Sequence, residues 1–136
     1  MRLFVRLALV VSALVAPSAC GSSQPSREDD ENAIRQTVTE WYVASARADG
    51  ARLCALIAPT ADRAARPGPR CATTAARQAR ENIIDEGIAP SVAHPVVRKI
   101  DLLADEANAF VRLGRGEQVV QLSRVDGRWL ISGFAS

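Results

Sequence analysis

From residue 34 onward, apolar residues recur at intervals of three or four positions. This spacing places them on one face of an α-helix. The acidic run at residues 28–31 comes just before them, where negative charge stabilises the first turn of a helix. Asp49-Gly50 follows them, and glycine is common just after a helix ends. The pattern predicts a long helix that stops at Gly50. Its inward positions are Ile34, Val38, Trp41, Tyr42 and Ser45.

Two further helices are predicted before residue 90. Residues 51–58 carry Leu53, Leu56 and Ile57 at helical spacing and end before Pro59. Pro67-Gly68-Pro69 interrupts the pattern, and Thr73 or Thr74 can then cap a third helix that runs to Gly87. The apolar positions of this third helix are Ala76, Ala79, Ile83 and Ile84.

From about residue 96 the apolar positions alternate, as they do in a β-strand. Val96, Arg98, Ile100 and Leu102 fall on one side of the first strand, and the residues between them fall on the other. Three more strands follow, and Asp126-Gly127 is the signal for a two-residue hairpin before the last one. Turns this short join antiparallel strands. The sequence predicts an α+β domain, with helices packed on a curved antiparallel sheet of four or more strands.

The first residues have the composition of a secretory signal. Arg2 and Arg6 precede an apolar run at residues 7–16, which is shorter than the roughly 20 residues that cross a bilayer as a helix. Small residues and then Cys20 follow, which resembles a bacterial lipobox although Pro17 replaces the usual aliphatic residue. We therefore expect a lipoprotein signal peptide at residues 1–19. The alternative is a signal that is cut elsewhere and leaves Cys20 as an unpaired thiol.

The expected mature chain begins with a lipidated Cys20 and a flexible tether, residues 20–28, and continues as one domain over residues 29–136. Its localisation would be the extracytoplasmic face of the cell membrane, where the lipid anchors it. Without Arg2 and Arg6, 15 basic residues balance 15 acidic ones. This neutrality gives no reason to expect a nucleic-acid partner. The basic stretch from Arg63 to Arg80 either attracts anionic headgroups or is a solvated helix face.

Cys54 and Cys71 remain once Cys20 carries lipid. In an exported chain two such cysteines are expected to pair, and the bridge would join the second helix to the third. The alternative is two buried thiols. No metal site is expected, because His94 is the only histidine. No phosphate loop or nucleophile elbow is present either, and no cofactor is expected.

Three segments carry a resemblance to a known family. The segment from Glu31 to Ile57, KIDLLADEANAFVRL from Lys99, and QLSRVDGRWLISGF from Gln121 together resemble the nuclear transport factor 2-like superfamily, and more narrowly small lipoproteins of high-GC Gram-positive bacteria. The resemblance covers the chain from about Asp30 onward. It implies a cystatin-like cone, in which a bent sheet wraps the long first helix and the mouth holds a small apolar ligand or a partner chain.

The same resemblance directs attention to the residues that would line such a cone. The candidate pocket residues are Trp41, Tyr42, Asp101 and Trp129. Each aromatic side chain could equally belong to the core. The superfamily includes ketosteroid isomerases and polyketide cyclases, yet no catalytic pair of these enzymes matches positions of this chain, so no catalytic residue is assigned.

Three functions remain open at this point. The first is a non-catalytic, membrane-anchored domain that binds a small apolar ligand or an envelope protein. The second is an isomerase or cyclase that uses Asp101, Tyr42 or His94 for acid-base chemistry. The third is a homodimer formed by sheet faces.

Overall fold

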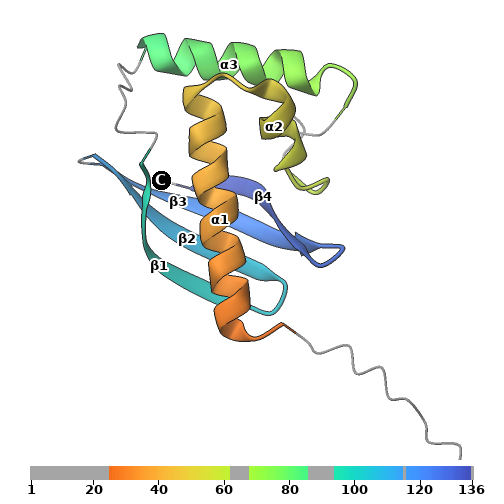
Figure 1. Ribbon diagram of the computed structural model, residues 1–136, viewed down its shortest axis with the longest axis vertical. Helices are drawn as coiled ribbons and strands as arrows, with labels where there is room; N and C mark the ends of the chain where they lie inside the picture. Colours follow the sequence, from red (N-terminus) through yellow and green to blue (C-terminus); the bar gives the residue numbers. More distant parts are fainter. Residues whose placement is uncertain (1–24, 62–67, 86–93, 115, 136) are drawn as a thin grey trace, which may run out of the picture.

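The computed structural model describes residues 25–61, 68–85, 94–114 and 116–135. Within these ranges the helices come first and the strands follow, as predicted (Figure 1). The elements are α1 (Arg27–Ala46), α2 (Gly50–Ala55), α3 (Cys71–Asp85), β1 (Val96–Leu103), β2 (Glu106–Leu113), β3 (Gly116–Val125) and β4 (Arg128–Ala135).

A capping box sets the start of α1. The Asp29 backbone N–H donates to the Ser26 hydroxyl at 3.2 Å, and the Ser26 backbone N–H donates to the Asp29 carboxylate at 3.0 Å. These two bonds satisfy backbone donors that a helix start otherwise leaves without a partner. The helix therefore includes Arg27 and Glu28, which the sequence analysis assigned to the tether.

The predicted end of the first helix at Asp49-Gly50 is wrong. α1 ends at Ala46, and Ala48 makes the turn with a φ of 51°. Asp49 instead caps α2, because its side chain accepts a hydrogen bond from the Arg52 N–H at 3.0 Å. Gly50 is the first residue of α2, and its lack of a side chain allows the backbone of α3 to approach at Ala72.

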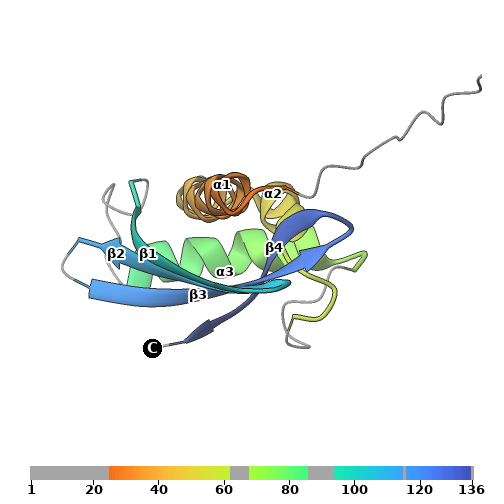
Figure 2. The ribbon, with the colours of Figure 1, turned by 90° about the horizontal axis from the view of Figure 1, so that it is seen from below.

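The strands form one antiparallel sheet in the order β1-β2-β3-β4, which confirms the predicted arrangement. Asp126 and Gly127 have φ values of 50° and 75°, as the mirror-image hairpin turn requires. On the outer edge of β4, the Ile131 N–H donates to the Leu56 carbonyl at 2.8 Å. The sheet is curved, and α1 lies against its concave face (Figure 2).

A bulge changes which side chains of β1 face inward. The register with β2 shifts between Val97 and Lys99, so Arg98 is the extra residue. Val97 consequently packs against the core together with Ile100 and Leu102. The predicted alternation is therefore wrong for the start of the strand and right from Ile100 onward.

The core fills the space between α1 and the concave face of the sheet. Ile34 and Val38 of α1 are completely buried, as are Ala109, Val111 and Val120 of the sheet. Burial of this apolar surface is the main favourable contribution to folding.

α3 packs on a smaller cluster at the far end of α1. Ala44, Leu53 and Ala79 form this cluster. Because α3 begins at Cys71, Thr73 and Thr74 lie within its first turn, and the prediction that one of them caps the helix is wrong. Gly87, the predicted end of the helix, lies outside the described residues, as do the side chains of Ile83 and Ile84.

Candidate functional site

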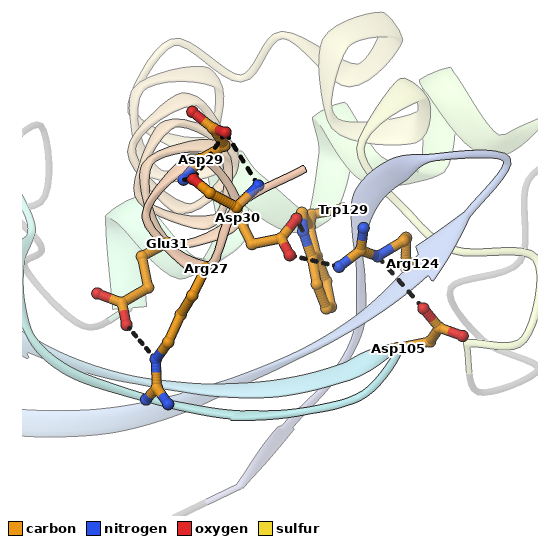
Figure 3. Close-up of polar contacts among 8 residues, drawn as sticks. Arg27, Asp29, Asp30, Glu31, Asp105, Arg124 and Trp129 are labelled. Carbon is orange, nitrogen blue, oxygen red and sulfur yellow. Dashed lines mark hydrogen bonds and ion pairs between the residues drawn. The ribbon is translucent and has the colours of Figure 1, made fainter. Parts of the chain in front are cut away.

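A polar cluster lies between α1 and the sheet, at the end where α1 begins (Figure 3). Asp30 of α1 accepts a hydrogen bond from Arg124 of β3 at 2.5 Å and another from the indole N–H of Trp129 at 3.0 Å. The Arg124 guanidinium also stacks on the Trp129 ring, 4.7 Å from its centroid. The Thr37 hydroxyl donates to the Trp129 carbonyl at 3.0 Å. These contacts from α1, β3 and β4 provide partners for polar groups that would be costly to bury alone.

Two carboxylates surround the single guanidinium of Arg124. In addition to Asp30, Asp105 lies with a carboxylate oxygen 3.3 Å from Nε, although this buried N–H makes no aligned hydrogen bond. The positive charge is therefore already compensated, which leaves little attraction for an anionic ligand. The arrangement fixes the first turns of α1 to the sheet.

The sequence analysis missed this cluster because it assigned the four acids at residues 28–31 only a role in stabilising the first turn of the helix. Asp30 is in fact 7% exposed. A signal for its burial exists in the sequence, since Asp30 precedes Ile34 by four residues and so lies on the same helix face. Arg124 likewise continues the inward alternation of Val120 and Leu122 along β3.

Tyr42 lies on the buried face of α1 and contributes to the main core cluster. Its hydroxyl donates a hydrogen bond to the side-chain carbonyl oxygen of Gln118 in β3 at 2.6 Å. Burial raises the pKa of Tyr42 to about 12, because the charged phenolate loses hydration there. The hydroxyl is thus a neutral group that stabilises the contact between α1 and β3.

The four candidate pocket residues do not come together in one pocket. Tyr42 and Trp129 lie in the main core cluster. Trp41 is half-buried between the two clusters and packs on Phe134, with ring centroids 5.5 Å apart. Asp101 lies on the opposite face of the sheet, because it is adjacent in β1 to the inward-facing Ile100. The alternation of side chains along a strand explains the separation.

The groups proposed for acid-base chemistry are separated in the same way. Asp101 is exposed and forms an ion pair with Lys99, whose Nζ lies 2.9 Å from the carboxylate. His94 is an exposed residue before β1. Tyr42 lies inside, bonded to Gln118. The described parts of the chain therefore do not place these three side chains around one substrate position.

The outer face of the sheet, opposite α1, carries a row of polar side chains across β1, β2 and β3. The strand register aligns Asp101 with Asn108, Asn108 with Gln121, and Gln121 with Gly133 of β4. A side chain at Gly133 would approach the Gln121 amide oxygen to 2.7 Å, so the glycine leaves room for Gln121 to lie across it. We call Asp101, Asn108 and Gln121 the polar row.

A hollow of about 420 Å³ lies over the polar row and the next positions toward the β1–β2 turn. Its volume is within the range of about 300–1,000 Å³ that is common for small-molecule sites. The residues with side chains or backbone in its wall include Asp101, Leu103, Asn108, Gln121, Ser123 and Ser132. This hollow is the candidate binding site that the structure offers.

A disulfide joins Cys54 of α2 to Cys71 of α3, as predicted for an exported chain, with the two Cα atoms 5.9 Å apart. The described residues contain no group of three histidine, cysteine or acidic side chains that could hold a metal ion.

The expected signal peptide, lipidated Cys20 and most of the tether lie outside the described residues. Among the helices that the structure describes, none has the length and hydropathy to span a membrane. Arg63 and Arg66 of the basic stretch also lie outside the described residues, whereas Arg77 and Arg80 are exposed on α3.

No family model matches this sequence, and no match is found among curated proteins. Solved structures do resemble it. A domain of unknown function with a cystatin-like fold from Nostoc punctiforme is 18% identical, with a TM-score of 0.53, and the match covers 80% of this chain and 76% of that chain. The chain has a cystatin-like fold. An NTF2-like protein of unknown function from Shewanella baltica is 14% identical over 82% of this chain and 94% of that chain, with a TM-score of 0.48.

The cystatin-like fold agrees with the cone that the nuclear transport factor 2-like resemblance predicts, with one long helix against a curved four-stranded sheet. At this level of identity the likeness concerns the fold alone, and a fold of this kind hosts unrelated functions. The function must therefore be argued from the surfaces of this chain.

Proposed function

We propose that this chain is a lipid-anchored, extracytoplasmic binding module that acts without catalysis and binds a component of the cell envelope with the outer face of its sheet. One observation carries the proposal. The concave face of the cystatin-like sheet is filled by α1 and the core, whereas the outer face carries an open hollow with polar side chains. The outer face is therefore the surface that a ligand can reach.

A small apolar ligand inside the cone is supported less well. Ile34, Val38 and Val120 have no exposed surface, and the cluster of Asp30 and Arg124 occupies the end of this space where α1 begins. An apolar ligand would have to displace these side chains, at the cost of their packing. An envelope component at the outer face requires no such rearrangement.

The isomerase or cyclase alternative is supported less well for a related reason. Acid-base catalysis requires groups that converge on one reacting position. Asp101 and Tyr42 lie on opposite faces of the sheet, and each already has a partner within the chain.

The anchor can be tested separately from binding. We expect the wild-type chain to carry lipid mass on Cys20 and to fractionate with membranes, whereas a Cys20→Ala variant loses both properties. A Cys20→Ala variant that stays in the membrane fraction, together with a wild-type chain of unlipidated mass, would overturn the anchor.

Occupancy of the outer face can be measured by the reaction of an introduced thiol with a membrane-impermeant maleimide on intact cells. Ser132→Cys places the thiol in the wall of the hollow and keeps the carboxamides of the polar row, and Gln78→Cys places a matched thiol on the exposed surface of α3. We expect Gln78→Cys to react equally fast in cells and in the purified protein. Ser132→Cys should react several-fold more slowly in cells, because the envelope component covers it.

Two outcomes would overturn this proposal. Equal reaction of Ser132→Cys in cells and in the purified protein would mean that the outer face is empty. If the introduced thiol of the purified protein reacts more slowly as the protein concentration rises, a second copy covers the face, as in the homodimer alternative.

A further inference from the structure

We propose that the hollow over the polar row binds a neutral saccharide of the cell envelope. The inference rests on the proposed function, because it names the class of ligand that the outer face takes. Its basis is the chemistry of the side chains in the hollow, the charge around them and the apolar surface at its rim.

The hollow presents groups that both donate and accept hydrogen bonds. Asn108 and Gln121 contribute carboxamides, each with an N–H₂ donor and a carbonyl acceptor, and Ser123 contributes a hydroxyl. Adjacent strands are about 4.8 Å apart, so the side chains of the polar row follow one another at a distance that one small ligand can bridge. The hydroxyl groups of a sugar, which also donate and accept, complement such a row.

The charges around the hollow favour a neutral ligand. Asp101 already forms an ion pair with Lys99 at 2.9 Å, so it can accept a hydrogen bond from a hydroxyl without requiring a cation. Glu106 also borders the hollow, and the wall contains no arginine or lysine. With Asp101 paired to Lys99, the Glu106 carboxylate remains beside the hollow, and its negative charge disfavours phosphate or carboxylate ligands.

Apolar surface lies beside these polar groups. Leu103, at the end of β1, is 77% exposed and forms part of the wall. The ring carbons of a sugar carry hydrogens that form an apolar patch, and Leu103 offers a surface to cover it. A site of this kind combines a few directed hydrogen bonds with apolar contact, as small-molecule sites do.

A protein partner fits this face less well. Protein interfaces usually contain aromatic, arginine or large aliphatic anchors near their centre. The large apolar side chains that are exposed in the described residues are Val96, Leu103 and Phe134. Val96 begins the edge strand and Phe134 packs against Trp41, which leaves Leu103 as the exposed large apolar side chain of the hollow. Phe110 and Val119 lie beside the polar row on the same face, but both are half-buried, and the Lys99 ammonium lies over the Phe110 ring.

The side-chain amides of the polar row provide a direct test. The ¹⁵N-labelled, lipidated chain is purified in detergent and titrated with maltotriose, chitotriose or the anionic trisaccharide trigalacturonate, while the N–H₂ signals of its asparagines and glutamines are followed by NMR. We expect maltotriose or chitotriose to shift the signals of Asn108 and Gln121 saturably. The signals of Gln36 on α1 and Gln78 on α3 should stay in place, and trigalacturonate should bind more weakly.

Variants make the test specific. Asn108→Ala should weaken saccharide binding several-fold while the rest of the spectrum keeps its dispersion, and Gln78→Ala should leave binding unchanged. Equal affinity of Asn108→Ala and wild type would overturn the inference, as would shifts that do not saturate or trigalacturonate binding as tight as that of the neutral sugars.

The failure of this inference can be distinguished from failure of the proposed function. If Ser132→Cys is protected in cells but no trisaccharide shifts the amides of the polar row, the saccharide is wrong and the binding face stands. If the thiol is unprotected in cells and the amides do not respond, both are wrong.

Discussion

Arg124 is the side chain that joins the first turns of α1 to the sheet. Its partner Asp30 is nearly buried, so loss of the guanidinium would leave a carboxylate without a counter-charge. We expect Arg124→Met to lower the free energy of unfolding by about 3 kcal/mol, as is typical when one member of a buried ion pair is removed. The measurement is urea denaturation followed by the fluorescence of Trp41 and Trp129, the second of which packs against Arg124.

A matched arginine controls this prediction. Arg112 is exposed on β2, and we expect Arg112→Met to change the stability by less than about 0.5 kcal/mol. Replacing both partners, Asp30→Leu with Arg124→Met, should be milder than Arg124→Met alone, because no unpaired charge remains. Equal losses from Arg124→Met and Arg112→Met would show that the ion pair is not what fixes α1.

Tyr42 should make stability depend on alkaline pH. Burial raises its pKa in the folded chain to about 12, above the ordinary tyrosine value of 10.0. The unfolded chain therefore releases this proton first, and the stability from Tyr42 is fully present below about pH 10 and is lost as the pH rises toward 12. Since Tyr42 is the only tyrosine, the tyrosinate absorbance of the native protein reports it alone.

The control for this titration is Tyr42→Phe. The variant should be less stable by about 1 kcal/mol at neutral pH, because Gln118 loses its hydrogen-bond donor. The difference in the free energy of unfolding between wild type and Tyr42→Phe should become smaller above pH 10. If Tyr42 of the native protein titrates near the ordinary tyrosine pKa of 10.0, its phenol is hydrated in solution.

The contact between α2 and α3 depends on a glycine. A Cβ at Gly50 would overlap the backbone carbonyl of Ala72 and come within 2.9 Å of the Ala76 Cβ. Because backbone atoms cannot move aside easily, Gly50→Ala should cost about 1–3 kcal/mol of stability. Gly68→Ala is the control, since nothing lies within 4 Å of its Cβ position. The midpoints of thermal unfolding of the two variants are compared. Equal midpoints would contradict the close approach of α3 to Gly50.

The disulfide should stabilise α3 more than the sheet. It closes a loop with a sequence separation of 17 residues, and removing such a bridge costs about 3 kcal/mol in the chain-entropy model. Apart from this bond, α3 packs mainly on the small cluster around Leu53. In a Cys54→Ser, Cys71→Ser variant, hydrogen exchange should therefore accelerate more in α3 than in β2 and β3. Uniform acceleration would indicate that α3 and the sheet unfold as one unit.

The order and type of the helices and strands could be predicted from the sequence more accurately than the residues at which they begin, end or bulge. The alternation and the Asp126-Gly127 turn identify the meander, because each depends on local chemistry alone. The bulge at Arg98 changes which side chains of β1 face the core, and no local feature of the sequence predicts it. Asp49-Gly50 has the composition of a helix end, and only the tertiary approach of Ala72 explains why the glycine begins the next helix.

The residues of the candidate site could likewise be predicted from the sequence only in part. Asp101 is a predicted pocket residue, and it does border the hollow, but most of the other residues of the wall come from three other strands. Asn108 and Gln121 reach the polar row through strand register, which a bulge or a turn of different length would change. As long as the strand pairing is not known, nothing in the sequence distinguishes Asn108 and Gln121 from other polar residues.

The arrangement of the elements predicts how the chain would meet the membrane through the proposed lipid anchor. Residues 20–26 can reach about 20–25 Å when fully extended, and α1, with 20 residues, is about 30 Å long. α3 lies at the end of α1 farthest from Arg27 (Figure 1), so the exposed Arg77 and Arg80 are at the end opposite the tether. Because the expected mature chain also has no net charge, the lipid should supply nearly all of the membrane affinity.

We therefore expect the lipidated chain to bind neutral and anionic vesicles nearly equally, and a Cys20→Ala chain to bind neither. The variant Arg77→Gln with Arg80→Gln should sediment with anionic vesicles as wild type does, because these arginines do not reach the headgroups when the tether holds the other end. Reduced sedimentation of this variant on anionic vesicles alone would mean that α3 lies on the membrane. That orientation would turn the start of α1 outward and require the tether to fold back along the domain.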